Sequence, residues 1–194
     1  GNQIVGRFDE LEATDVQLTP TGGTLPWDAD ERLLRLNGVR AAGSISPIDV
    51  STEFVTALPI DVVDRAEVYP LPVNAMSPTA FRAVRASLWT GKTFDASTED
   101  SAVAVLGFGA ASRLGISRVD QQPAIFIGER TFTVIGILDD VGRRPELLDS
   151  IMIPNGVARS AFGLEGVASV QIEAELGAAQ LVGRQGRIAL SPDD

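Results

Sequence analysis

The stretch from residue 102 to residue 138 most strongly limits what this chain can fold into. Residues 102–106 form an apolar run of strand length, and residues 109–114 have the composition of a short helix that Gly115 can end in the left-handed conformation. Residues 123–127 and 131–138 are β-rich runs joined by a short link that contains glycine, which predicts a β-hairpin. The order strand, helix, hairpin predicts an α+β fold.

The N-terminal part of the chain predicts a strand, a helix and a second strand. Residues 14–18 alternate polar and apolar side chains, as a half-buried strand does. Asp28 and Glu31 have the spacing of a capping box and predict the start of a helix, after which residues 39–45 return as a strand. Residues 4–12 mix apolar and acidic positions, and we interpret them as the tail of a helix.

The C-terminal part predicts the same order, with a strand at 167–174, a helix at 177–182 and a strand at 187–190. Because the two ends repeat one pattern, we expect them to pair in one strand-helix-strand subdomain with a β-rich subdomain inserted between them. The predicted bounds are residues 4–72 and 165–190 for the first subdomain and residues 73–164 for the inserted one.

A further helix is predicted after Ser77, since a capping residue followed by Pro78 is typical of a helix start. Phe81, Val84 and Leu88 would then form one apolar stripe. The two tryptophans, Trp27 and Trp89, lie beside predicted helices, and we interpret both as core residues rather than as anchors for a partner.

The amino-acid composition argues against several classes of function. The chain has no cysteine and no histidine, so it lacks disulfides, thiolate nucleophiles and the commonest general base and metal ligand. A net charge of −10 argues against nucleic acid as a partner. No run without charge reaches the ~20 apolar residues of a membrane helix, and no basic segment leads into an apolar one as in a signal peptide. We therefore expect a soluble domain without catalytic, cofactor or metal residues.

Two motifs have a functional and a structural interpretation. Gly107-Phe108-Gly109 between a strand and a helix could bind a nucleotide, but Ser112 occupies the third glycine position, so a tight turn is the better interpretation. The acidic residues Asp139, Asp140, Glu146 and Asp149 could hold calcium, but their spacing matches no calcium loop. A solvated, charged loop explains them better.

Several short motifs, in order, resemble the MacB-like periplasmic core domain of ABC transporter permeases of the MacB and FtsX kind. They are the helix end Leu-Asn-Gly-Val at 36–39, Gly-Lys-Thr-Phe at 91–94, the strand and helix Ala-Val-Ala-Val-Leu-Gly at 102–107 with Ala111 to Leu114, Phe-Thr-Val-Ile-Gly-Ile at 132–137, and Ile153-Pro154. Together these motifs cover most of residues 36–162.

The resemblance implies a non-catalytic domain held outside the cytoplasm between two transmembrane helices of a permease in the cell membrane. Such a domain would couple conformational change and contact substrate or partner proteins. The implied partners are a cytoplasmic ATPase domain or subunit, a second permease copy and an exported substrate, and no cofactor is implied. A freestanding secreted module that binds a ligand or a protein remains an alternative, as does an enzyme that uses carboxylates.

The polar stretch at residues 139–149 is the predicted contact surface, because loops rich in charge, proline and glycine are exposed and mobile. Within it, Arg143, Arg144, Glu146 and Asp149 are the candidate residues for contact with a partner.

Overall fold

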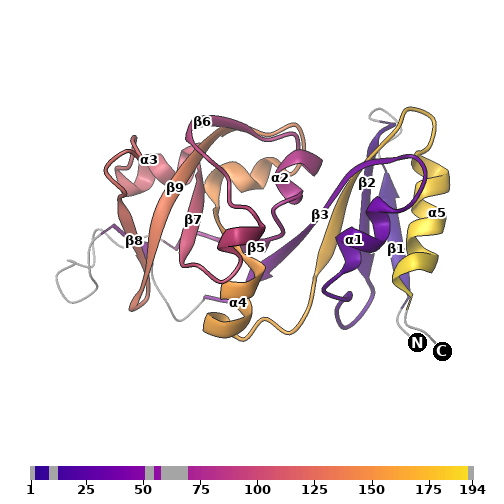
Figure 1. The fold of residues 1–194 in the computed structure, drawn as a ribbon, viewed down its shortest axis with the longest axis horizontal. Helices are drawn as coiled ribbons and strands as arrows, with labels where there is room; N and C mark the ends of the chain where they lie inside the picture. The colour runs from indigo at the N-terminus through magenta and orange to yellow at the C-terminus, as the bar shows by residue number, and fades with distance from the viewer. Residues whose placement is uncertain (1–2, 9–12, 51–54, 58–69, 192–194) are drawn as a thin grey trace. The chain divides into compact units, whose positions relative to one another are not determined.

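The chain passes four times between two structural units. The computed structural model describes residues 3–8, 13–50, 55–57 and 70–191 (Figure 1). The first unit comprises Gly1–Ser46, Thr79–Arg85 and Glu165–Asp194, and the second comprises Pro47–Pro78 and Ala86–Leu164. This grouping differs from the predicted subdomains at two places, since it joins residues 47–72 to the second unit and residues 79–85 to the first.

The first unit contains an antiparallel sheet in the order β1-β2-β11-β3. The strands are β1 (Ile4–Phe8), β2 (Asp15–Pro20), β11 (Ser169–Ala174) and β3 (Val39–Ile48), the last two residues of which belong to the second unit. The last strand of the described residues, β11, therefore lies between β2 and β3. The expected pairing of the two chain ends in one sheet is present in this unit.

Two helices cover one face of this sheet, α1 (Ala29–Leu34) and α5 (Ala179–Leu190). Figure 1 shows α5 beside β1, and α5 also contacts β2 and α1. The helices pack onto alternate residues of the strands, as the two-residue repeat of a strand requires. The shared core includes Leu18, Ala42, Val170 and Ile172 from the strands and Leu33, Val182 and Leu190 from the helices.

Two predictions for the chain ends are wrong. Residues 4–8 are not the tail of a helix but strand β1, which pairs with β2 from Ile4 opposite Pro20 to Phe8 opposite Val16; residues 9–12 lie outside the described residues. Residues 187–190 are not a strand, because α5 continues through them. Gly186 lies inside this helix and lets it pack closely on β2, since a Cβ there would lie 2.7 Å from Leu18 Cδ1.

The second unit contains a mixed sheet in the order β5-β10-β7-β9-β8-β4, with β6 also paired to β9. The β10–β5 and β7–β9 pairs are parallel, and the other pairs are antiparallel. Its strands are β5 (Val73–Met76), β10 (Ile151–Pro154), β7 (Val103–Gly107), β9 (Arg130–Asp140), β8 (Ala124–Ile127), β4 (Val55–Thr56) and β6 (Ser87–Gly91). β8 and β9 form the hairpin that the sequence predicts.

The helices of this unit are α3 (Phe108–Leu114) and α4 (Asn155–Phe162), with short 3-10 turns η2 (Ala96–Thr98) and η3 (Pro145–Asp149). α3 and α4 contribute to one hydrophobic core with the sheet. Gly115 and Gly163 end the two helices with φ of +71° and +69°, where residues with a side chain are strained. Both ends are where the sequence predicts them.

The helix predicted from Ser77 to Leu88 is shorter than expected. α2 (Ala80–Ala83) stops near Arg85, whose φ is +55°, and Leu88 lies in strand β6. Phe81 and Val84 are buried as predicted, whereas Leu88 and Trp89 are exposed. The prediction that Trp89 is a core residue is therefore wrong, while Trp27 packs partly buried against the core of the first unit.

Candidate functional site

The four predicted contact residues lie on and just before η3, between β9 and β10. Arg143 is buried, with 4% of its surface exposed, so its side chain is not part of the outer surface. Arg144 has φ of +57°, and its Nε lies 2.7 Å from Glu146 Oε1. Glu146 and Asp149 are exposed. The structure therefore joins Arg144 to Glu146 and leaves two carboxylates at the surface.

η3 packs closely on the turn between β7 and α3. A Cβ on Gly107 would lie 2.3 Å from the carbonyl oxygens of Leu147 and Leu148, and a Cβ on Gly109 would lie 2.1 Å from Asp149 Oδ1. Leu147 is fully buried beneath this turn. The two glycines of the Gly-Phe-Gly motif thus allow η3 to approach the backbone, which explains them without a nucleotide.

An aromatic pair lies at the start of α3. The rings of Trp89 on β6 and Phe108 on α3 are 5.9 Å apart between centroids and cross at 76°, an edge-to-face geometry. Their exposed fractions are 59% and 46%. The pair borders a pocket of about 370 Å³ whose other lining residues come from α3, the segment after it and β9. Sequence reasoning missed this site, although Trp89 and Thr90 are residue types that are enriched in strands.

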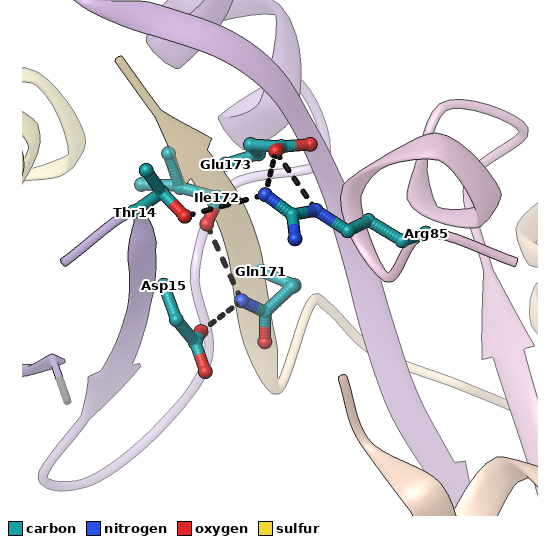
Figure 2. A network of polar contacts seen from close by, with 6 residues as sticks. All are labelled: Thr14, Asp15, Arg85, Gln171, Ile172 and Glu173. Atoms are coloured by element: carbon teal, nitrogen blue, oxygen red, sulfur yellow. Dashed lines mark hydrogen bonds and ion pairs between the residues drawn. The ribbon is translucent and has the colours of Figure 1, made fainter. Parts of the chain in front are cut away.

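A polar network holds the end of the α2 segment in the first unit (Figure 2). Arg85 Nε and Nη2 donate hydrogen bonds of 2.9 and 2.5 Å to Glu173 Oε1 on β11, and Nη2 also donates to Thr14 Oγ1 at 3.4 Å. Beside them, Gln171 Nε2 donates to Asp15 Oδ1 at 2.5 Å. Gln171 and Glu173 alternate with the core residues of β11, so they lie on the face opposite α1 and α5.

Two further contacts hold the start of this segment. Thr79 Oγ1 donates a hydrogen bond of 3.0 Å to Asp30 Oδ2. Gly43 on β3 lies against the backbone of Ala80, since a Cβ there would be 2.2 Å from both the nitrogen and the Cα of Ala80. Residues 79–85 are thus held at both ends by elements of the first unit.

Neither a metal centre nor a membrane span emerges from the described part of the chain. Its acidic side chains form no group of three or more that could hold a metal ion. Within the same residues, no helix has both the length and the apolar character needed to cross a bilayer.

Comparison with known proteins gives a consistent assignment. The MacB-like periplasmic core domain family matches residues 2–183. Among solved structures, the extracellular domain of the noncanonic ABC-type transporter YknZ from Gram-positive bacteria is similar, with a TM-score of 0.68 and 13% identity over 97% of this chain and 91% of that chain. The periplasmic region of MacB from Actinobacillus actinomycetemcomitans is also similar, with a TM-score of 0.65 and 11% identity over 91% of this chain and 81% of that chain.

At this level of identity, the solved structures establish a shared α+β fold. A search of curated proteins found no match. The family match covers nearly the whole chain and confirms the resemblance that the strand and helix motifs indicate. The chain belongs to the MacB-like periplasmic core domain family, the extracytoplasmic domains of ABC transporter permeases.

Proposed function

We propose that this domain is a non-catalytic coupling element of its permease, which passes conformational change from the membrane side to a surface that contacts a partner or substrate. The observation that carries the proposal is the segment Thr79–Arg85. It belongs to the first unit, whereas its neighbours in sequence on both sides belong to the second. The chain consequently crosses between the units after Ser46, Pro78, Arg85 and Leu164.

Four crossings transmit force better than the two that a simple insertion would provide. The polypeptide backbone is covalent and has few soft degrees of freedom per residue, so a short crossing passes displacement on. The anchors at Asp30, Gly43 and Glu173 prevent the segment from sliding on the first unit. Movement of the first unit would therefore pull on the second unit at several points.

In this proposal, the first unit is the part of the domain that the membrane helices would move. Its elements β1 and α5, the first and last of the described chain, contact one another. In a domain placed between two membrane helices, both connections to the membrane would then leave from this unit. ATP hydrolysis by a cytoplasmic ATPase domain or subunit would move those helices, and the first unit with them.

The second unit would supply the contact surface for an exported substrate, a partner protein or a second permease copy. The exposed carboxylates Glu146 and Asp149 on η3 are its candidate contact residues, and Arg144 holds Glu146 in place. Arg143 has a packing role in this proposal because it is buried.

The coupling role is tested in the full permease with its ATPase. Insertion of Gly-Ser-Gly between Arg85 and Ala86 would lengthen one crossing and lower the amount of substrate transported per ATP hydrolysed. The matched control is the same insertion after Leu176, a residue 85% exposed in a turn of the first unit. Equal transport by the two insertion variants, both folded, would contradict coupling through the crossings.

The contact role is tested by reversing charge. Glu146→Lys would weaken partner binding or transport, whereas Glu129→Lys, at an exposed position in the β8–β9 turn, would leave both unchanged. If Glu146→Lys and Glu129→Lys behave alike, η3 is not the contact surface.

A further inference from the structure

The pocket beside Trp89 owes its shape to one face of α3. Phe108, Ala111, Ser112 and Gly115 follow the three- and four-residue spacing that places side chains on one side of a helix. Beyond the Phe108 ring these side chains are small, and a Cβ on Gly115 would meet nothing within 4 Å. The helix therefore leaves open space next to the aromatic pair.

The walls of the pocket carry no charge. Trp89, Phe108, Ile116 and Ile137 supply its apolar surface, and the polar side-chain groups of its lining residues are the hydroxyls of Ser112 and Ser117 and the indole N–H of Trp89. The next residue, Arg118, is not part of the lining, and its guanidinium is paired with Asp120, with 2.6 Å between Nη2 and Oδ2. A charged ligand would lose hydration here without gaining a counter-ion, whereas an uncharged one would not.

The aromatic pair favours a ring as the ligand. Trp89 and Phe108 already meet edge to face, and both leave large exposed areas against which a further ring can stack or pack by its edge. A volume of about 370 Å³ lies at the small end of known ligand pockets, which span roughly 300–1,000 Å³. It fits a molecule of two or three rings.

We propose that this pocket binds a small, uncharged aromatic molecule. The inference goes beyond the coupling role, which needs no ligand in the pocket. Equal transport by the two insertion variants would contradict the coupling role and leave this proposal standing, and absence of binding would leave the coupling role standing.

The test uses two probes that share one ring system. N-phenyl-1-naphthylamine is uncharged, and 8-anilino-1-naphthalenesulfonate carries the same rings with a sulfonate. Both are titrated into the protein carrying Trp27→Phe, so that Trp89 is the only tryptophan. We expect saturable, one-to-one binding of the uncharged probe that quenches Trp89, and binding about tenfold weaker for the sulfonate.

A matched pair of variants locates the binding. Ser112→Phe places a ring inside the pocket, whereas Ser160→Phe makes the same change on the exposed face of α4, beside Arg159 and Asp100. We expect Ser112→Phe to weaken binding of the uncharged probe at least about tenfold and Ser160→Phe to leave its binding unchanged. If Ser112→Phe does not fold, Trp89→Ala, at an exposed position, gives the same comparison by probe fluorescence.

Three results would each overturn the proposal: no saturable binding of the uncharged probe, equal binding of the two probes, or unchanged binding in the pocket variant.

Discussion

Gly43 and Ala80 touch backbone to backbone, although 36 residues lie between them in the sequence. A Cβ on Gly43 would lie 2.2 Å from the nitrogen and Cα of Ala80, closer than real atoms approach. The contact brings the α2 segment onto the face of the sheet opposite α1 and α5. It also makes residue 43 a position where only glycine fits.

Gly43→Ala should destabilise the first unit, because the added methyl group has to push α2 off β3. Overpacking of this kind costs about 1–3 kcal/mol. Gly6→Ala on β1 is the matched control, since its nearest neighbour, Leu18 Cδ2, would be at an ordinary 3.6 Å. Urea unfolding of both variants measures the difference. Equal urea unfolding midpoints for Gly43→Ala and Gly6→Ala would show that α2 does not pack on Gly43.

The two glycines of α5 should respond differently to alanine. Gly183→Ala adds a methyl group that meets nothing within 4 Å, and it should stabilise the helix by about 0.5–1 kcal/mol. Gly186→Ala places its methyl group 2.7 Å from Leu18 Cδ1 and 3.0 Å from Leu33 Cδ2, so crowding offsets that gain. Thermal unfolding should rank the first variant above the second. The reverse order would mean that this face of α5 does not pack on β2.

Ser150→Ala should destabilise the second unit. Its buried hydroxyl oxygen accepts a hydrogen bond of 2.7 Å from Asn74 Nδ2, which the substitution removes. An amide left unsatisfied in a core costs about 1–3 kcal/mol. The exposed Ser160→Ala serves as the control, and urea unfolding midpoints provide the measurement. If Ser150→Ala lowers the urea unfolding midpoint no more than Ser160→Ala does, the result would argue against the hydrogen bond between Asn74 and Ser150.

Asp95 should make a pH-dependent contribution to stability. Hydrogen bonds from the Ser97 hydroxyl and backbone N–H lower the pKa of this carboxyl below its usual value. A carboxyl with a lowered pKa stabilises the fold above the unfolded pKa of about 3.9 and loses that effect as the pH falls through the folded pKa. The gap in melting temperature between wild type and Asp95→Asn should be largest near neutrality and shrink in acid. A gap that does not change with pH would contradict this.

The features that were predicted correctly are encoded locally. Gly115 and Gly163 end their helices because each follows a short helical run and adopts positive φ without a side chain. The β8–β9 hairpin follows from two β-rich runs and the Gly128-Glu129 turn. One correct prediction is long-range: the two ends of the chain meet in one sheet as expected, although only the fold shows that β11 lies between β2 and β3.

The features that were mispredicted depend on distant partners. The C-terminal helix was predicted to end at residue 182 and a strand to follow at 187–190, yet α5 continues to Leu190 and packs Gly186 against Leu18. Ile4–Phe8 had no clear period, and its pairing with β2 decides its conformation. At the candidate site, the charge, proline and glycine content of residues 139–149 predicted an exposed Arg143, which is buried, whereas the pocket beside Trp89 depends on β6 meeting α3.

The position of β11 has a consequence for how the protein is made. A ribosome completes β2 and β3 early, but the strand that separates them in the sheet is Ser169–Ala174, near the end of the sequence. Until it emerges, β2 and β3 each lack a partner along one edge, and open strand edges invite pairing with other chains. Most of the second unit is synthesised before that moment. Newly made chains are therefore most exposed to wrong strand pairing until residues 169–174 have been made.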